Sequence, residues 1–400
     1  MASLPFWKIQ RELSRFGRQL AAAPGNIWRY WTERPFYDMV TARQIRVSDG
    51  GIPPSDNVAL FLIFPADGIL KSHLHSLRWL TDNGYAPLVI SNVPLTDTDR
   101  ATLHDHAWRI LERPNVGYDF GGYRDGILSL ADRLPSLKRL VIVNDSAWFP
   151  MPGTDGWLSE AETSGYDVVS ASFHWGIARV DTEDFREIRW EFSTDDRNFH
   201  YGSFALSVGA NVLRDPAFLG FWKRYRLTGD KSKTVRRGET GFSQWILRSG
   251  YSHTATLDLT TLDTDLAAMP DDQVIDLAQN LILHEDMLMR GKKLEVLAGP
   301  DGRDPKTLIP LILTSIARQG VSYALPHHII RAKGYPFLKK SPLWACPDTQ
   351  SIMLDFIDGI TGDQGPDIQS EAEALVAKRR DRLQPDITPL YETRLALRRR

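Results

Sequence analysis

The 400-residue chain has one cysteine, Cys346, and no excess of either charge. A single cysteine excludes a disulfide framework and a cysteine-based zinc cluster, and gives no sign of an oxidising compartment. Basic residues number 48 and acidic residues 50, for a formal net charge of −2. This balance argues against a protein that binds nucleic acid through bulk positive charge.

The sequence also lacks long apolar runs. No uncharged apolar stretch reaches the roughly 18 residues needed to span a bilayer. The best candidates, VALFLIFPA (58–66) and LIPLILTSIA (308–317), are half that length and predict a strand and a helix. The beginning of the sequence has no apolar core of a secretory signal, so we expect a cytoplasmic protein.

Both ends of the chain are basic. Residues 4–22, within an extension over 1–50, place bulky apolar side chains on one helical face and basic ones around it. Such a helix can lie on an anionic membrane, here the inner face of the plasma membrane, or pack on the protein's own core or a partner subunit. Residues 346–400 are predicted to be a second basic, partly helical tail, interrupted by Pro385.

The middle of the chain alternates strands and helices. Besides 58–66, strands are predicted at 86–92, 137–146, 165–173, 200–208 and 251–259, with helices at 69–84, 96–113, 122–133, 215–225 and 239–250. This alternation predicts an α/β domain over 56–270, with a mostly parallel sheet flanked by helices, and a helical part over 271–345. Ligands of such sheets bind beyond the carboxyl ends of the strands.

One predicted strand ends in Asn144-Asp145-Ser146. An amide, a carboxylate and a hydroxyl at a sheet edge suit Mg²⁺ or Mn²⁺ that is also held by a diphosphate, with Asp145 as the protein's metal ligand. The alternative is that Asp145 or Ser146 caps the next turn.

The stretch RPNVGYDFGGYRDGI (113–127) is rich in glycine and predicts a loop. Asp119 could bind a sugar hydroxyl or a ribose, and Arg124 a phosphate. Alternatively, Asn115 and Asp119 form local turns, and the glycines relieve backbone strain.

Glu239 opens a predicted helix directly after the basic stretch KSKTVRR (231–237). The positive end of a helix favours an ionised carboxylate, which could act as a base, while Arg236 and Arg237 would attract a phosphorylated ligand. The alternative is a solvated basic loop followed by a capping glutamate. His174 and His200 lie beside predicted strands, where histidines are usually structural.

Taken in order, these segments resemble the rhamnan synthesis protein F family, glycosyltransferases of bacterial surface polysaccharide assembly. The resemblance covers about residues 56–345. It lies in NVGYDFGGYRDGI (115–127), LVIVNDSAWFP (140–150), SFHWGIAR (172–179), HYGSFALSV (200–208), FLGFWKRY (218–225), GETGFSQWILRSGY (238–251) and GYPFLKKSPL (334–343), and in VALFLIFPADGIL (58–70) ahead of them. The first two segments are the most specific. Where glycosyltransferases of this kind carry a DxD motif, this sequence has a single aspartate, Asp145.

The resemblance implies a GT-A-like domain that transfers a sugar, such as rhamnose or another deoxyhexose, from a nucleoside-diphosphate donor to a glycan or lipid-linked glycan of a surface polysaccharide or lipopolysaccharide. It implies a divalent ion at Asp145 and an inverting reaction with Glu239 as base. The residues assigned to the donor are Asp67, Asn92, Asn115, Gly117, Tyr118, Asp119, Gly121, Gly122, Arg124, Asn144 and Ser146. Those assigned to the acceptor or a phosphate are His174, Trp175, His200, Ser203, Arg236 and Arg237.

Two other function classes remain open. One is a non-catalytic subunit or scaffold of a polysaccharide assembly complex, which the single aspartate favours. The other is a metal-dependent phosphate-ester hydrolase, which would need carboxylates at several successive strand ends. The sequence does not show such a series.

Overall fold

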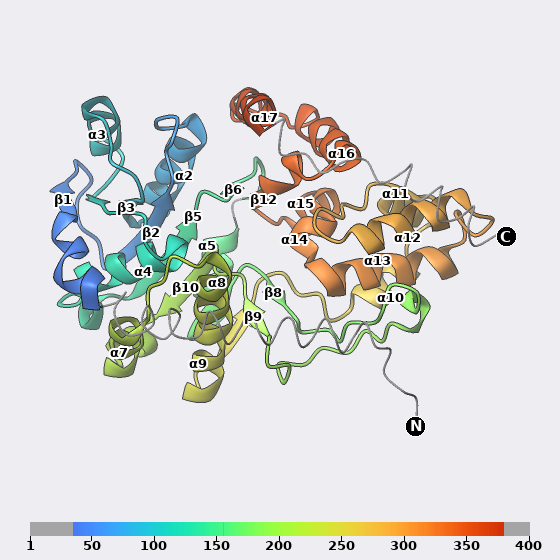
Figure 1. Ribbon diagram of the computed structural model, residues 1–400, viewed down its shortest axis with the longest axis horizontal. Coiled ribbons are helices and arrows are strands. Elements are labelled where there is room, and N and C mark those ends of the chain that lie inside the picture. Colours follow the sequence, from blue (N-terminus) through green and yellow to red (C-terminus); the bar gives the residue numbers. More distant parts are fainter. Residues whose placement is uncertain (1–34, 155, 380–400) are drawn as a thin grey trace, which may run out of the picture.

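The computed structural model describes residues 35–154 and 156–379 and is built on one eight-stranded sheet (Figure 1). The strand order is β1-β4-β3-β2-β5-β10-β7-β11. In that order the strands are Arg46–Asp49, Arg109–Glu112, Ala86–Ser91, Asn57–Ile63, Arg139–Asn144, Ala205–Gly209, Val168–Ser170 and His253–Ala255. The predicted strands of the middle region therefore lie in one sheet.

The sheet is mostly parallel. Strands β2, β3, β4 and β5 run in the same direction, whereas β1 and β10 run antiparallel to their neighbours. The chain moves outward from β2 through β3 to β4 and then returns to β5 on the other side of β2. The strand order therefore reverses between β2 and β5, and the carboxyl ends of these two strands frame the crevice where such sheets bind ligands. This architecture confirms the predicted α/β class, with a mostly parallel sheet flanked by helices.

Helices cover both faces of the sheet because its central strands are apolar on both sides. The nearest ones are α2 (Lys71–Asp82), α3 (Asp97–His104), α4 (Tyr118–Ser129), α7 (Pro216–Arg224) and α9 (Gly241–Ser249). Phe61 of β2 packs in one core cluster with Leu77 of α2, whereas the neighbouring Leu60 packs in a second cluster with Ile127 of α4 and Trp222 of α7. This alternation of side chains along a strand divides the hydrophobic core into two layers.

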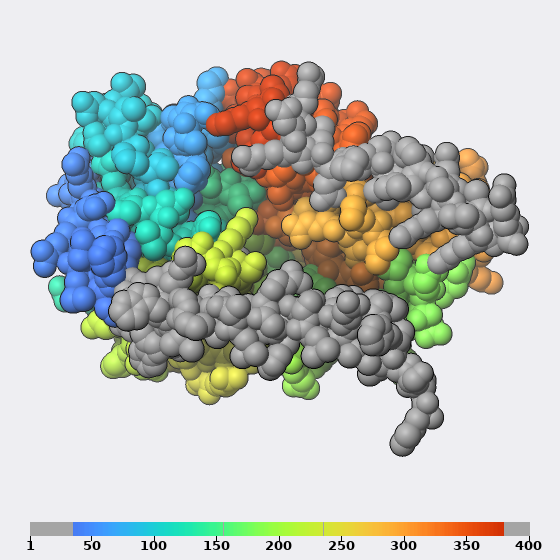
Figure 2. Space-filling view, in the orientation of Figure 1, coloured from blue at the N-terminus to red at the C-terminus, as the bar shows by residue number. Residues whose placement is uncertain are grey.

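From residue 262 to the end of the described residues the chain is mainly helical, as predicted. Its helices are α10 (Leu262–Ala267), α11 (Asp271–Gln279), α12 (Met287–Ala298), α13 (Pro305–Gln319), α14 (Val321–Ala324), α15 (Pro326–Lys333), α16 (Pro347–Asp358) and α17 (Gly365–Arg379). The last two helices lie where a basic tail from residue 346 onward was predicted, and they correct that prediction. Asp367 pairs with Lys71 of α2 at 2.7 Å, and Glu371 accepts a hydrogen bond from the N–H of Ser72 at 2.9 Å. Figure 2 shows these two parts of the chain side by side.

Three other expectations of local structure were wrong. The helix predicted over 96–113 ends at His104, and β4 follows it. The segment 46–49, assigned to the N-terminal extension, is the edge strand β1 and pairs with β4. In both cases tertiary pairing overrides the local pattern. The helix predicted over 122–133 begins four residues earlier, at Tyr118, so residues 118–121 of the predicted loop are helical.

No helix within the described ranges is long and apolar enough to cross a bilayer. The amphipathic segment 4–22 and the basic residues 380–400 lie outside the described part of the chain.

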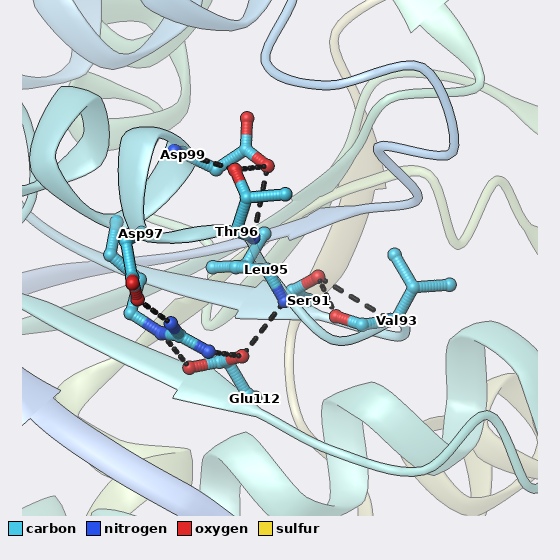
Figure 3. A network of polar contacts seen from close by, with 8 residues as sticks. Ser91, Val93, Leu95, Thr96, Asp97, Asp99 and Glu112 are labelled. Carbon is cyan, nitrogen blue, oxygen red and sulfur yellow. Dashed lines mark hydrogen bonds and ion pairs between the residues drawn. The ribbon is translucent and has the colours of Figure 1, made fainter.

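A buried glutamate fastens the connection between β3, α3 and β4 (Figure 3). Glu112 accepts two hydrogen bonds from Arg100, at 2.7 and 3.0 Å, and one from the N–H of Leu95 at 2.9 Å. Thr96 caps α3 in a reciprocal arrangement with Asp99. Burial alone would raise the pKa of Glu112, but Arg100 and the N–H of Leu95 more than reverse this effect and lower it.

We expect Glu112→Gln to lower the free energy of unfolding at neutral pH by about 2 kcal/mol, because it removes the charge from three hydrogen bonds. A carboxyl group whose pKa is lower in the folded state stabilises the fold above its unfolded pKa, and this stabilisation is lost as the pH falls through the folded pKa. The difference from the wild type should therefore shrink in urea titrations carried from about pH 7 to about pH 3. A constant difference would contradict this assignment. The exposed Glu373 supplies the control variant Glu373→Gln.

Candidate functional site

The candidate site lies where β2 and β5 end side by side. Leu62 pairs with Asn144, and the next residue, Asp145, donates its N–H to the carbonyl of Leu62 at 3.0 Å. The Asp145 side chain reaches back across the strands, and its Oδ2 accepts a hydrogen bond from the N–H of Phe64 at 2.8 Å. This double link fixes the carboxylate at the point where the strand order reverses.

Asn144 connects this strand end to α4. Its Oδ1 accepts hydrogen bonds from the N–H and the hydroxyl of Ser146, at 3.1 and 2.6 Å. Its Nδ2 donates to the hydroxyl of Tyr123 at 2.8 Å and to Oδ2 of Asp119 at 3.3 Å. The amide therefore uses both of its polar atoms within the protein, and it holds Asp119 beside the end of β5.

Glu239 reaches the same edge of the sheet from the other side. It lies in a π-helical turn, Arg236–Thr240, which separates α8 (Lys231–Val235) from α9. Such turns often occur at functional sites. The hydroxyl of Ser203 donates to Oε1 of Glu239 at 2.7 Å, and Nε2 of His200 lies 3.8 Å from Oε2. The structure thus brings Ser203 and His200 together around the predicted base.

A third group at the site is a pair of lysines that were not predicted as site residues. The short strand β12 (Leu338–Lys339) pairs with β6 (Ala147–Trp148), and the N–H of Lys340 donates to the carbonyl of Ser146 at 3.1 Å. The ammonium of Lys339 donates to the Ser146 hydroxyl at 3.0 Å. The only sequence signal for this contact was the segment GYPFLKKSPL, which was matched to the family without a role.

His73 of α2 was also missed. The N–H of Leu70 donates to its Nδ1 at 3.2 Å, so the hydrogen bonding assigns the proton to Nε2, which lies 3.4 Å from Oδ2 of Asp145. A lone buried histidine in a helix carries no signal that distinguishes this role from simple packing.

Charges at the site act on one another. Burial would raise the pKa of Asp145, but His73, the Lys340 ammonium and the N–H of Phe64 lower it overall, so this carboxylate is ionised at neutral pH. Desolvation, together with the negative charges of Asp145 and Glu239, raises the pKa of Asp119 to about 6. The three carboxylates therefore lie close enough to repel one another, although water reaches Asp119.

The residues around Asp145 do not fit a preformed divalent-metal site. Oδ2 of Asp145 is already bonded to the N–H of Phe64, and the polar side-chain atoms of Asn144 and Ser146 are engaged with one another or with Lys339. Among residues 35–154 and 156–379, no group of three or more histidines, cysteines and acidic residues is arranged to hold a metal ion. An incoming cation would also meet the ammonium groups of Lys339 and Lys340.

Several predicted donor residues lie elsewhere. Arg124 is only 4% exposed, and it pairs with Asp38 at 2.8 Å and donates to the carbonyl of Trp222 at 3.2 Å. The hypothesis that Arg124 binds phosphate is therefore wrong, because the core already uses its guanidinium. Asp67 is exposed and pairs with Lys378 of α17 at 2.7 Å.

The remaining donor residues surround the beginning of α4. Asn92 is buried beneath it, accepts a hydrogen bond from Arg113 at 2.7 Å, and contacts the carbonyl of Tyr118 at 3.5 Å. Asn115 is exposed in the turn before the helix. The hydroxyl of Tyr118 donates to the carbonyl of Gly229 at 3.1 Å.

The α4 glycines serve close packing, not a flexible loop. A Cβ on Gly122 would lie 2.5 Å from Leu62 of β2, and one on Gly121 only 2.1 Å from the carbonyl oxygen of Val116. Gly117 has a φ of +80° at the N-cap, a conformation that favours glycine. Gly122 lets α4 approach β2, whereas Gly117 and Gly121 allow the tight turn at its beginning, and together they place Asp119 near the strand ends.

The acceptor residues proposed from the resemblance form a second layer behind Glu239. The rings of His174 and His200 lie 5.5 Å apart, and Arg179 contacts both Nε2 of His174, at 2.6 Å, and the Trp175 ring, at 3.2 Å from its centroid. Trp175 has a φ of +63°, which is strained for a bulky residue. Burial, with His200 and Arg179 nearby, lowers the pKa of His174 to about 3, so this ring is neutral at neutral pH.

Two predicted cations share the π-helical turn with Glu239. Arg236 is exposed and Arg237 is partly buried. Gly238, between them and Glu239, packs on the Phe120 ring, where a Cβ would lie 2.3 Å from the nearest ring carbon. The turn is therefore held against α4.

Replacing Gly121 tests the packing of α4. Alanine favours a helix by about 1 kcal/mol over glycine, but overpacking costs about 1–3 kcal/mol. Because the clashing atom is a backbone carbonyl, we expect Gly121→Ala to lower the free energy of unfolding by about 1–2 kcal/mol in urea titrations. Gly229, which has nothing within 4 Å of its Cβ position, gives the control Gly229→Ala. A Gly121→Ala protein as stable as this control would refute the packing argument.

Replacing Asp119 tests whether it is repelled by the negative charges of Asp145 and Glu239. An acid whose pKa rises on folding destabilises the fold as the pH rises between its unfolded pKa, near 3.8, and its folded pKa of about 6. Asp119→Asn should therefore stabilise the protein at about pH 7.5 by about 1 kcal/mol after solvent screening, and not at about pH 4. The measurement is urea unfolding at both pH values, with Asp132→Asn at an exposed position as control. Equal effects at both pH values would count against charge repulsion.

Comparison with known proteins places this sequence in a family. The family model of rhamnan synthesis protein F matches residues 88–359. The uncharacterized protein y4gN of Sinorhizobium fredii is 32% identical over 232 residues, which cover 58% of this chain and 56% of that protein. Virulence protein VirA of Vibrio anguillarum is 26% identical over 167 residues, covering 38% and 54%. The chain thus spans about half the length of these curated relatives.

Among solved structures, the mannosyltransferase PcManGT from Pyrobaculum calidifontis, in complex with GDP-Man and Mn²⁺, is similar with 13% identity and a TM-score of 0.29 over 90% of both chains. The mannosyltransferase Ktr4p from S. cerevisiae has 9% identity and a TM-score of 0.22, over 44% of this chain and 62% of that one. Such remote likeness carries no inference about the substrate. The family match covers more than half of the chain, and the protein therefore belongs to the rhamnan synthesis protein F family.

Proposed function

We propose that this protein transfers a sugar from a nucleoside-diphosphate donor to a hydroxyl group of a growing bacterial surface polysaccharide or lipopolysaccharide. The observation that carries the proposal is the convergence of Asp145, Asp119 and Glu239 at the edge where the strand order reverses. Family membership supports the reaction class. The family description favours rhamnose, or another deoxyhexose, as the sugar.

Glu239 is the proposed general base. It accepts a hydrogen bond from Ser203, which fixes one carboxylate oxygen, while the second oxygen lies 3.8 Å from His200. A carboxylate held in this way can take the proton from an acceptor hydroxyl as that oxygen attacks the anomeric carbon. If the attack comes from the face opposite the leaving diphosphate, the anomeric configuration inverts. A positioned base contributes roughly 10²–10⁴ in rate.

Asp119 is the proposed contact for the donor's sugar or ribose. Water reaches this side chain, and Asn144 orients it by a hydrogen bond to Oδ2. Asn144 and Ser146, both assigned to the donor from the sequence, are better described as positioning residues, because their polar atoms bond within the protein.

The acceptor would lie on the side of Glu239 that faces His200. Trp175 and His174 supply aromatic surface there, and the strained backbone of Trp175 is the kind of feature that persists at binding sites. Apolar faces of sugar rings pack on such side chains. The amphipathic segment 4–22 is proposed to bring the enzyme to the cytoplasmic face of the plasma membrane, near lipid-linked acceptors.

A divalent ion at Asp145, which the family resemblance implies, has no preformed ligand set among the described residues. We therefore assign no step of the reaction to it. Asp145 instead contributes a fixed negative charge, which His73, Lys340 and the N–H of Phe64 stabilise.

A non-catalytic subunit of a polysaccharide assembly complex is the second candidate. The engaged side chains of Asn144 and Ser146 favour it, because they leave Asp145 alone to meet a donor. The position of Glu239 opposes it, since a scaffold has no need of an oriented carboxylate at the crevice. A phosphate-ester hydrolase is disfavoured, since Glu112 at the end of β4 is already bound by Arg100.

The decisive variant is Glu239→Gln. It keeps the shape and one hydrogen-bond acceptor for Ser203 but removes the base, so we expect transfer and slow donor hydrolysis to fall about 10²–10⁴-fold while nucleotide binding persists. The assay is a panel of nucleoside-diphosphate sugars with Mg²⁺ and Mn²⁺ in the buffer. Glu187→Gln, at an exposed site, is the matched control. Full activity of Glu239→Gln would remove Glu239 as the base, and a wild type inert with every donor would favour the scaffold.

A further inference from the structure

Two consecutive lysines are buried at the candidate site. Lys339 is only 4% exposed and Lys340 only 7%. Taking an ammonium group out of water is costly unless it is paired and hydrogen-bonded. Two such groups in adjacent positions therefore call for a compensating negative charge.

The pairing of β12 with β6 fixes where these lysines lie. Lys339 is opposite Ala147, two residues beyond Asp145, and Lys340 follows directly after the strand. The ammonium of Lys339 contacts the Ser146 hydroxyl at 3.0 Å and lies 3.2 Å from the centroid of the Phe204 ring. That of Lys340 lies 5.3 Å from the centroid of the Trp148 ring. The two cations thus flank the segment that follows β5.

Hydrogen bonds within the described protein do not occupy all the N–H donors of the two ammonium groups. An ammonium has three donors. Within the described ranges, Lys339 makes one side-chain hydrogen bond, to Ser146, and the side chain of Lys340 makes none. Glu239 and Asp119 influence Lys339 through their charge, and Asp145 influences Lys340, but none of these carboxylates comes within ion-pair distance of either ammonium.

The lowered pKa of Lys339 is consistent with a site that binds an anion. Burial lowers its pKa to about 7, and the charges of Glu239 and Asp119 only partly oppose this effect. An anionic ligand at the same place would restore the charged form.

We propose that Lys339 and Lys340 bind the diphosphate of the sugar donor and stabilise the negative charge of the leaving group, the role that a divalent ion has in metal-dependent transfer. This inference rests on the proposed function, because it assigns a residue pair to the same donor site. Two lysines can act as point charges for a diphosphate, as lysines do in other phosphate sites. The alternative ligands Asn144 and Ser146 are already engaged, and Ser146 itself binds Lys339.

The reaction balances without another component. The bond between the anomeric carbon and the diphosphate oxygen breaks, and its electron pair stays on that oxygen, whose charge the two ammonium groups offset. The acceptor oxygen forms the new bond to the anomeric carbon, and its proton moves to Glu239. The products are the glycoside and a nucleoside diphosphate.

The test measures binding of UDP, GDP and dTDP to the full chain by isothermal titration calorimetry, first in EDTA and then in Mn²⁺. We expect wild type to bind at least one of them in EDTA. Lys339→Met and Lys340→Met should each weaken that binding about 10-fold or more, and Lys339→Arg should restore part of it. The control is Lys293→Met, which removes a buried lysine of α12 whose ammonium donates to the carbonyls of Gln279 and Leu281, at 2.7 and 2.8 Å.

Each outcome has a definite meaning. Binding in EDTA that survives both methionine variants overturns the lysine assignment, and so does wild-type binding that requires Mn²⁺; either result leaves the glycosyltransferase proposal standing. Failure of all three diphosphates to bind with or without Mn²⁺ overturns the proposed function and this inference with it. Circular dichroism verifies folding, and if Lys339→Met does not fold, Lys340→Met decides.

Discussion

The site depends on one link between two neighbouring parallel strands. Asp145 donates its main-chain N–H to Leu62 and accepts the N–H of Phe64 with its side chain, so one residue joins the ends of β2 and β5 twice. These bonds lie where the strand order reverses, which is where a parallel sheet opens a crevice. Every other side chain at the site is placed relative to this link.

Asn144 links the end of β5 to the surrounding elements by hydrogen bonds. An amide with two acceptor and two donor interactions inside the protein cannot rotate without losing hydrogen bonds, and buried polar networks of this kind specify one arrangement. Through Asn144 and Ser146, the helix α4 on one side and the strand β12 on the other are both tied to β5. This framework also sets the charges of the site, because the carboxylates of Asp119 and Glu239 act through their charge on the ammonium of Lys339 in β12.

Much of the fold could be predicted from local patterns. The apolar run in β2, the helical spacing in α2 and the proline at the first turn of α7 each produce the expected element. The prediction failed where tertiary contacts decide. Residues 109–112 continue a helical pattern in sequence but pair with β1 and β3 as a strand. The glycines of α4 suggested a loop, yet they allow a helix to approach Leu62 and the carbonyl of Val116.

The sequence by itself determined the α/β class, the strand that ends in Asn144 and Asp145, and Glu239 as a candidate base, because apolar periodicity and polar strand ends are local signals. Only the tertiary structure decided which charges meet. Arg124, within one of the two most specific segments, is buried and pairs with Asp38, whereas Lys339 lies 193 positions beyond Ser146 and touches it. Strand pairing joins positions that no sequence spacing connects, and for this reason the cations of the site became visible only in the folded chain.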